Sequence, residues 1–571
     1  MNRFLKSSRV KWISSMLIVM VVSVGLLGFN NDDKRNFSII KNLDIFYTLF
    51  RELNSYYVDE TNPEKLIKTG IDNMLESLDP YTTYIPEDDM EDFKFMTTGE
   101  YGGMGSLISK NGEYIVIAEP YEGFPAQKAG LKAGDKLLEV NGVHVVGKAS
   151  SEVSELLKGA PNTPLKLKID RPGTNKPLTI ELIREKISIN PVPYFGMVND
   201  KTGIIILNNF TQNCSKEVEK ALIDLKENQG AQSIILDLRA NPGGLLDDAV
   251  KIVNLFVKKG SEVVSTRGKV KQWDKVYRAT KEPVDTIIPL TVLISRGSAS
   301  ASEIVAGSLQ DMDRAVLVGQ RSFGKGLVQT TRNLSYNSKL KVTTAKYYIP
   351  SGRCIQAVDY SNRNEDGSVG LIPDSLISEF KTFGGRSVYD GGGVSPDVKV
   401  DITKYGNISF ALVAQNMFFN FATDFCIKNK EISSAERFKI TDAIFDNFKA
   451  FVASKEDFKY ESATQDALKK LKQTAKREEY YEKSKAEFEQ LEKLLKLDVQ
   501  KDLNIFRKEI SELLGAEIIK RYYYQKGAIK YSLQEDEELD KALEILSDPS
   551  KYNGILKGTV LSHAGDKRGI K

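Results

Sequence analysis

Short apolar runs alternate with amphipathic runs over residues 188–400, and few folds accept that alternation. Runs such as SIILDLR (233–239) and PLTVLIS (289–295) are typical of strands buried on both faces. A chain that alternates such strands with helices forms a parallel sheet covered by helices. We therefore predict an α/β core with a largely parallel sheet. The predicted strands are 203–210, 233–239, 289–295, 315–319, 327–334 and 339–350, and the predicted helices are 214–229, 245–257 and 301–310.

The 571 residues suffice for three or four domains, and the composition changes along the chain divide it into five segments. Residues 1–33 are a membrane anchor or signal segment, 34–97 a helical region, 98–187 a glycine-rich, β-rich α+β domain, 188–400 the α/β core, and 401–571 a charged, mostly helical region. The helices within 34–97 are packing elements or a dimer surface. Those within 401–571 are a solvated surface or a surface that binds a partner, and they carry no motif for chemistry.

The N-terminus is predicted to be a targeting segment. Four basic residues precede an uncharged run from Trp12 to Phe29, which is as long as the shortest membrane spans of roughly 17–20 residues. Basic residues ahead of such a run keep that end inside the cell. A cleaved signal peptide is the alternative, but no A-x-A site and no lipobox cysteine is evident. The body is expected in the cell envelope, anchored in the inner membrane and facing the periplasm, or periplasmic after cleavage.

Composition excludes several classes of function. The net charge of +3 gives no basic surface for nucleic acid. The three cysteines, Cys214, Cys354 and Cys426, are far apart and predict no zinc site. The two histidines, His144 and His563, both lie outside the α/β core, so a Ser-His-Asp triad has no histidine there. No metal and no cofactor is expected.

Two stretches within residues 98–187 resemble a PDZ domain. AGLKAGDKLLEVNG (129–142) is similar to the most recognisable part of that domain, and the run Tyr101, Gly102, Gly103, Met104 and Gly105 is similar to its carboxylate-binding loop. Glycines let successive backbone N–H groups converge on a terminal carboxylate, and the peptide then adds as a strand to the sheet edge. His144, just past the second stretch, is interpreted as an ordinary loop or strand residue.

The run GQRSFGKGL (319–327) is similar to a phosphate-binding P-loop but fails as one. Gly326 stands where a Ser or Thr should bind Mg²⁺, and a strand rather than a helix follows. The apolar strand that ends in an acidic residue also precedes this loop, which reverses the usual order. A nucleotide-dependent folding factor is therefore excluded.

Two further motifs join strands to helices. In RGSASASEIVAGSL (296–309), a serine between a strand end and a helix start exposes its hydroxyl beside N–H groups that stabilise an oxyanion. The alternative is that Ser300 and Glu303 form only a capping box. In LRANPGGLLDDAV (238–250), the N–H groups of the two glycines can face a cleft. The alternative there is a tight turn that Arg239 and Asn241 stabilise.

Together these motifs resemble the C-terminal processing (tail-specific) protease family. The order of a helical segment, a PDZ domain, Asn-Pro-Gly-Gly, Ser-Ala-Ser-Ala-Ser-Glu and Ser-Phe-Gly-Lys-Gly matches, as do YYIPSGR (347–353) and GGGVSPDV (391–398). The resemblance covers roughly residues 40–400 and implies a crotonase-like core. It also implies a Ser-Lys dyad, with Ser300 as nucleophile, Lys325 as general base and Gln329 as the residue that orients the lysine. Ser298 and Ser302 are the rival nucleophiles. The implied oxyanion hole consists of the Ala301 N–H and that of Gly243 or Gly244.

The implied chemistry is consistent with the residues present. A serine needs a base to take its proton. Lysine serves only when neutral, so burial has to lower its pKa from ~10.4 toward roughly 7–8. The contact between Lys325 and Gln329 rests on the resemblance alone, since four residues of straight strand span about 13 Å.

We therefore expect a serine endopeptidase of the cell envelope whose PDZ domain captures apolar C-terminal tails of proteins or peptides. The alternative is a catalytically silent PDZ scaffold or chaperone. A homodimer or an adaptor as partner is left open, and the N-terminal segment is the expected contact with the membrane.

Overall fold

A computed structural model describes residues 34–401, 405–460 and 462–560, so the predicted targeting segment 1–33 lies outside the described residues. The chain divides into two compact units, Met1–Tyr84 and Ile85–Lys571. In the first unit, a helix over residues 34–56 precedes α2 (Pro63–Glu76). α2 begins where the Asn62 side chain accepts the Lys65 N–H (3.0 Å), with a proline at its first position. A short strand, β1 (Thr83–Ile85), lies at the boundary.

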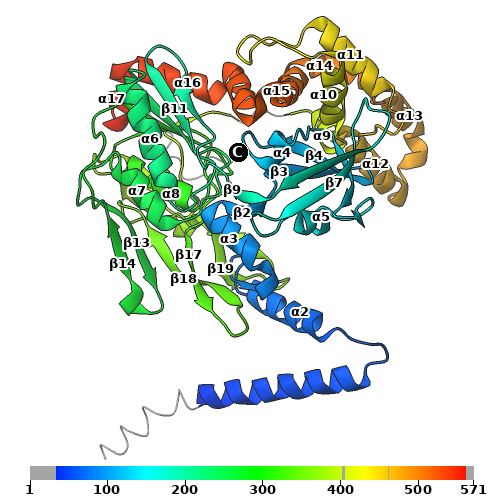
Figure 1. Cartoon of the computed structure of the whole chain (residues 1–571). Helices are drawn as coiled ribbons and strands as arrows, with labels where there is room; N and C mark the ends of the chain where they lie inside the picture. The colour runs from blue at the N-terminus through cyan, green and yellow to red at the C-terminus, as the bar shows by residue number, and fades with distance from the viewer. Residues whose placement is uncertain (1–33, 402–404, 461, 561–571) are drawn as a thin grey trace, which may run out of the picture. The chain divides into compact units, whose positions relative to one another are not determined.

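A six-stranded sheet lies at the centre of the α/β core (Figure 1). Its strand order is β10-β11-β12-β15-β16-β23, and every neighbouring pair is parallel except β10 with β11. β12 and β15 are buried along their whole length, which accounts for their apolar sequences. The predicted core with a largely parallel sheet is confirmed. The strands are β10 (Tyr194–Met197), β11 (Thr202–Ile206), β12 (Ser233–Asp237), β15 (Leu290–Ile294), β16 (Val316–Gly319) and β23 (Val398–Lys399).

Helices pack on both faces of this sheet. Three of them, α6, α7 and α8, share a hydrophobic core with one face. On the other face, Ile204, Ile235 and Leu293 pack against α16 and α17, which come from the far end of the chain. The C-terminal segment therefore covers the sheet, although no motif in the sequence signals this packing. The helices are α6 (Cys214–Glu227), α7 (Leu246–Asn254), α8 (Ala301–Asp311), α16 (Glu537–Ser547) and α17 (Pro549–Leu556).

A second sheet is antiparallel and was not foreseen. β17 (Leu327–Asn333) and β18 (Lys339–Tyr348) coincide with two predicted strands, but they pair with each other and, through β18, with β13 (Glu262–Gly268) and β14 (Lys275–Arg278). β17 and β18 are antiparallel because only a short turn joins them, and a parallel pair would need a long crossover connection. Two small hairpins follow: β19 (Val358–Arg363) with β20 (Val369–Leu371), and β21 (Glu379–Lys381) with β22 (Ser387–Tyr389).

The glycine-rich domain has a sheet in the order β3-β4-β5-β7-β8, with β6 paired to β5. β3 (Ser106–Asn111) is an edge strand, and α5 (Ser150–Leu157) contacts it. A separate pair joins β2 to β9. The exposed His144 lies in β6, as an ordinary strand residue. The other elements are α3 (Met90–Thr98), β2 (Glu100–Gly103), β4 (Tyr114–Pro120), α4 (Pro125–Lys128), β5 (Lys136–Val140), β6 (Val143–His144), β7 (Pro164–Asp170), β8 (Leu178–Ile183) and β9 (Glu185–Ser188).

The region after residue 404 is helical, as predicted, and has an aromatic core. Phe418 stacks on Phe448 with ring centres 5.3 Å apart, and Phe421 meets Phe448 edge-on. The backbone of the long α15 is not helical at Tyr524 (φ 54°). The helices before α16 are α9 (Asn407–Ala414), α10 (Met417–Lys428), α11 (Asp442–Ala453), α12 (Ala463–Arg477), α13 (Lys485–Leu494), α14 (Val499–Ile505) and α15 (Arg507–Ser532).

Within the described ranges, no single helix has the length and apolar composition of a membrane span. Of the helices that the structure describes, α9 and α10 meet those two criteria only when taken together, with an angle of 62° between them.

Candidate active site

The three serines of the Ser-Ala-Ser-Ala-Ser run have different surroundings. Ser298 is buried, and its hydroxyl donates to the Leu238 carbonyl (2.8 Å). Ser302 is also buried, and its hydroxyl donates to the Asn241 carbonyl (2.9 Å). Ser300 is half-buried, and among the described residues its hydroxyl has no hydrogen-bond partner. The two rivals are therefore committed to holding the backbone, while Ser300 has a hydroxyl that can react.

Ser300 occupies a strained turn between β15 and α8. Its φ of 56° and ψ of −112° are unusual for a residue with a side chain, and such a conformation costs about 1–3 kcal/mol. The capping-box interpretation is half right. Glu303 accepts the Ser300 N–H (2.8 Å), but the Glu303 N–H donates to the Ser300 carbonyl (2.9 Å) and the Ser300 side chain makes no cap bond.

The buried carboxylate of Glu303 joins the serine turn to the lysine loop. Its Oε2 accepts the N–H groups of Ser300 (2.8 Å) and Lys325 (2.9 Å), and its Oε1 accepts the Gly324 N–H (2.7 Å) and the Ser322 hydroxyl (2.5 Å). The pKa of Glu303 is raised, because burial outweighs the donors that lower it. The three N–H groups can only donate, so the two oxygens of Glu303 have to supply an acceptor for each of them.

Tyr347 makes a second link between the same two segments. Its hydroxyl lies 2.6 Å from the Lys325 carbonyl oxygen and 3.1 Å from that of Ser300, and its side chain is buried. A third link is the Phe323 N–H, which donates to the Ser298 carbonyl (3.0 Å). The backbones of Ser300 and Lys325 are therefore held side by side, although a whole helix and a strand separate them in the sequence.

The Asn-Pro-Gly-Gly turn lies directly against Ser300. Gly243 has a φ of +97°, and a Cβ there would approach the Ala299 carbonyl oxygen to 2.6 Å and Ser300 Cβ to 2.9 Å, so only glycine fits. The Gly243 N–H donates to Asn241 Oδ1 (2.9 Å). Among the described residues, by contrast, the N–H groups of Gly244 and Ala301 have no acceptor.

Gln329 lies in β17, next to a β-bulge between Val328 and Gln329. Its side-chain amide donates to Thr343 Oγ1 (3.1 Å) on the neighbouring strand. The strand is therefore not straight at Gln329. The span of about 13 Å between Lys325 and Gln329 that the sequence leads us to expect holds only for a straight strand.

The predicted carboxylate-binding loop spans β2 and the turn into β3. Tyr101, Gly102 and Gly103 belong to β2, which pairs with β9. Met104 lies in the domain core, and its carbonyl accepts the Ala126 N–H (2.7 Å). Gly105 precedes the edge strand β3. Burial raises the pKa of Tyr101, whose ring lies within 2.7 Å of the place where a Gly103 Cβ would be.

Three residues that organise this site were not identified from the sequence in those roles. The sequence indicates Glu303 only as a helix cap, Asn241 only as a turn residue, and Tyr347 only as part of the YYIPSGR motif. The Asn241 side chain donates to the Leu207 carbonyl (2.7 Å) while it accepts the Gly243 N–H, so it fixes the glycine turn. Each of the three residues lies inside a recognisable motif, and this was the feature of the sequence that could have indicated their roles.

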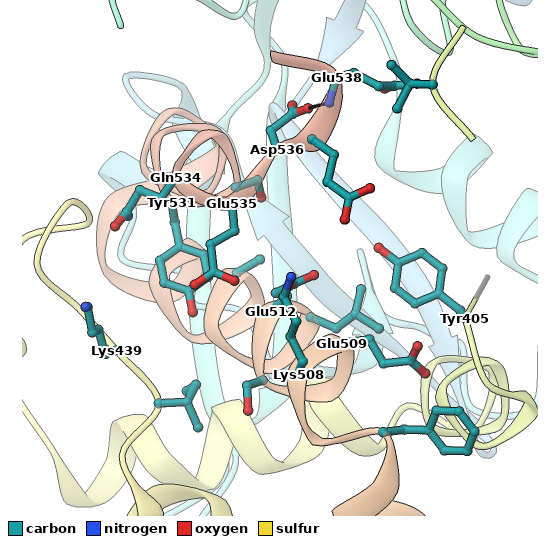
Figure 2. Close-up of a pocket in the computed structure, with 18 of the residues that line it drawn as sticks. Tyr405, Lys439, Lys508, Glu509, Glu512, Tyr531, Gln534, Glu535, Asp536 and Glu538 are labelled. Atoms are coloured by element: carbon teal, nitrogen blue, oxygen red, sulfur yellow. Dashed lines mark hydrogen bonds and ion pairs between the residues drawn. The ribbon is translucent and has the colours of Figure 1, made fainter. Parts of the chain in front are cut away.

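A cavity of about 810 Å³ lies elsewhere, between α15, the start of α16 and the core (Figure 2). Acidic residues outnumber basic ones in its wall, and they include Glu509, Glu512 and Asp536. Arg239 and Gln320 also line it, whereas Ser300 and Lys325 do not. The cavity is therefore distinct from the serine turn.

Comparison with known proteins identifies three parts of the chain. Residues 201–375 match the model of peptidase family S41, residues 116–171 match a PDZ domain, and residues 408–546 match the C-terminal helical domain of a probable PDZ-protease. The chain is 36% identical, over 371 residues, to the carboxy-terminal-processing protease of Bartonella bacilliformis, which covers 64% of this chain and 81% of that protein. The chain belongs to peptidase family S41.

The chain is similar to two further proteins. The chain is 33% identical over 409 residues to a probable CtpA-like serine protease of Staphylococcus aureus, which covers 70% of this chain and 73% of that one. The solved structure of a photosystem II D1 C-terminal processing protease is 30% identical to this chain. The match covers 62% of this chain and 92% of the solved chain, with a TM-score of 0.34. This S41 peptidase is therefore a serine protease with a PDZ domain and a C-terminal helical domain, and its predicted fold class is confirmed.

Proposed function

We propose that this S41 peptidase is an endopeptidase that cleaves by a Ser300–Lys325 dyad and selects substrates through their C-terminal tails. The observation that carries the dyad is the pair of links, Glu303 and Tyr347, that hold the backbones of Ser300 and Lys325 together. The unengaged Ser300 hydroxyl is the nucleophile, and Lys325 takes its proton. As the peptide bond breaks, Lys325 gives this proton to the leaving amine. Neutral again, the same lysine takes a proton from the water that releases the acyl group from Ser300.

The oxyanion of the tetrahedral intermediate is stabilised by two N–H groups, those of Ala301 and Gly244. Ala301 is the first residue of α8, where the helix dipole favours negative charge. Of the two glycines left open from the sequence, Gly244 has the N–H that is available, since the Gly243 N–H is bonded to Asn241. Gln329 supports the lysine through the bulged strand β17.

Tail recognition follows from the exposed edge of the PDZ sheet. A peptide that adds to β3, next to α5, has its terminal carboxylate near the Met104–Gly105 turn that begins this strand. An apolar tail residue suits the apolar interior to which Met104 belongs. The PDZ domain then brings the tail-bearing chain to the dyad.

The dyad is tested by cleavage of a tailed protein substrate with Ser300→Ala and Lys325→Ala. Both are expected to lose at least about 10³-fold in kcat/KM, since residual catalysis then comes from the oxyanion hole and binding alone. Exposed matched controls are Ser335→Ala and Lys259→Ala. Full activity in either dyad variant would exclude the dyad, and an inactive wild type would favour the silent scaffold.

Tail recognition is tested separately with Gly103→Val. The added side chain displaces the Tyr101 ring, which lies within 2.7 Å of the new Cβ. Cleavage of a tailed substrate should fall while cleavage of the same sequence without a tail is unchanged. Equal effects on both substrates would show that the PDZ domain does not select the tail.

We propose further that the peptidase body lies outside the cytoplasmic membrane, held by the apolar run within residues 12–29. The supporting observation is the charge pattern of the sequence alone. Accessibility of the body to protease in intact spheroplasts tests this, and protection would contradict it.

A second copy is the partner that suits the helix over residues 34–56, whose Leu43 and Phe46 are at least half exposed. Light scattering reports whether the chain is a dimer.

A further inference from the structure

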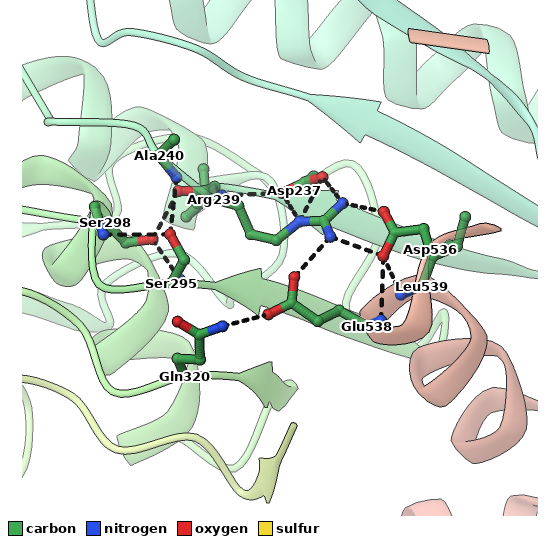
Figure 3. A network of polar contacts seen from close by, with 11 residues as sticks. Asp237, Arg239, Ala240, Ser295, Ser298, Gln320, Asp536, Glu538 and Leu539 are labelled. Carbon is green, nitrogen blue, oxygen red and sulfur yellow. Dashed lines mark hydrogen bonds and ion pairs between the residues drawn. The ribbon is translucent and has the colours of Figure 1, made fainter. Parts of the chain in front are cut away.

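Two carboxylates at the start of α16 contact Arg239 and Gln320 of the peptidase core (Figure 3). Asp536 accepts from Arg239 through both of its oxygens (2.8 and 2.7 Å), and Glu538 Oε2 accepts from the same guanidinium (2.7 Å). A third carboxylate, that of Asp237 at the end of β12, also accepts from Arg239 (2.6 Å). The guanidinium therefore joins the start of α16 to a strand end of the core sheet.

Arg239 leads directly into the glycine turn. Its neighbour Ala240 has a φ of 54° and donates its N–H to Ser295 Oγ (3.0 Å), and Asn241 follows. The Arg239 side chain is 20% exposed, and those of Asp536 and Glu538 are 13% and 15% exposed. Charge-assisted, bidentate bonds in such a half-enclosed place are stronger and more directional than surface ion pairs. The two carboxylates therefore fix the strand end from which the turn starts.

Glu538 also contacts the segment that leads to Lys325. Its Oε1 accepts from Gln320 Nε2 (3.2 Å), and a Cβ on Gly319 would lie 3.3 Å from that oxygen. Gln320 follows β16 directly, and its N–H donates to the Ile294 carbonyl at the end of β15 (2.9 Å). One side chain of α16 therefore touches the starts of both loops, the glycine turn and the lysine loop.

We propose that Asp536 and Glu538 are positioning residues of the active site, through which the C-terminal helical domain sets the glycine turn by Arg239 and the lysine loop by Gln320. The inference rests on the proposed dyad. Neither carboxylate touches the reacting atoms. Their effect is on where the Gly244 N–H and Lys325 lie when the substrate reacts, and a misplacement of about 1 Å in such groups can cost about 10²-fold in rate.

The test compares Glu538→Gln and the double variant Asp536→Asn/Glu538→Gln in the full-length chain. The matched controls on the same helix are Glu544→Gln and Asp540→Asn, both exposed. With a short peptide that lacks a tail, kcat of the double variant should fall at least about tenfold while KM stays within about twofold. The rate at which a fluorophosphonate labels Ser300 should fall in parallel, and both controls should match the wild type.

Arg239→Lys provides an independent variant, because lysine keeps the charge but cannot form the forked contacts. It should lower kcat in the same way. Thermal unfolding is measured for every variant, and activity is compared well below each midpoint. A lower midpoint with normal kcat and normal labelling would overturn the inference and leave only a structural role. Normal kcat and normal midpoints would overturn it as well.

Failure of the inference and failure of the proposed function are distinguishable. If Ser300→Ala abolishes cleavage but the α16 variants behave as the wild type, the dyad stands and the positioning role is wrong. If Ser300→Ala retains full cleavage, the proposed function itself is wrong.

Discussion

Replacement of Glu303 by glutamine tests whether the buried carboxylate holds the active site together. The side chain keeps its size, but one of its oxygens becomes an NH₂ group. In the wild type, four donors converge on the two oxygens: the N–H groups of Ser300, Lys325 and Gly324, and the Ser322 hydroxyl. The amide can accept from only one side of this arrangement.

The better orientation directs the amide oxygen to Ser300 and Lys325. The NH₂ group then faces Ser322, whose oxygen can accept, and the Gly324 N–H, which cannot. A buried donor without an acceptor costs about 1–3 kcal/mol, and each remaining bond loses its charge assistance, about 1 kcal/mol. Removal of a buried charge offsets part of this cost. The net loss is about 2–4 kcal/mol, equivalent to about 30-fold to 1,000-fold in a rate if it falls on the transition state.

The assay is kcat/KM on a peptide substrate together with the thermal midpoint of the peptidase core. We expect the midpoint to fall by about 5–15 °C, since 1 kcal/mol shifts a domain of this size by roughly 2–4 °C. The control is Glu282→Gln, an exposed glutamate in a surface ion pair. Unchanged kcat/KM and an unchanged midpoint would refute the reasoning, because a glutamine would then satisfy the same donors as the carboxyl group of Glu303.

Three further predictions test other parts of the structure. Tyr347→Phe keeps the buried ring but removes the hydroxyl between the Ser300 and Lys325 carbonyls. The lost hydrogen bonding is worth about 1–2 kcal/mol, so kcat/KM should fall about 5-fold to 30-fold. An unchanged kcat/KM would contradict this prediction. Burial, with Asp248 nearby, raises the pKa of Cys214 to about 12. Only the thiolate reacts with iodoacetamide, so at about pH 8 the reagent should leave Cys214 unmodified in the folded protein and modify it after denaturation. The prediction is wrong if Cys214 is labelled as fast in the folded protein as in the denatured protein. Lys520 of α15 pairs with Glu119 of the PDZ domain (2.8 Å), so Lys520→Met should lower the ratio of tailed to untailed cleavage several-fold. A double-mutant cycle with Glu119→Gln checks that pair, and additive effects would show that the two residues are not coupled.

Local patterns were sufficient to predict most of the secondary structure. The predicted strand SIILDLR contains β12, and the predicted helix 214–229 contains α6. Period and apolar content are properties of neighbouring residues, so they can be read along the chain. The pairing of β17 with β18 in a second sheet was missed, because strand content alone does not specify which sheet a strand joins.

The sequence by itself determined the order of the domains, the membership of the chain in a peptidase family, and the short motifs that contain Ser300 and Lys325. The resemblance implied Ser300 as the nucleophile, but only the tertiary structure showed that the hydroxyls of Ser298 and Ser302 are engaged, in hydrogen bonds to the distant residues Leu238 and Asn241. It also decided that Gly243, not Gly244, has its N–H engaged. No motif in the sequence indicates the contact of α16 with Arg239. Hydrogen-bond partners that are far apart in the sequence are set by packing, and any carboxylate brought to the same place could make the same bonds.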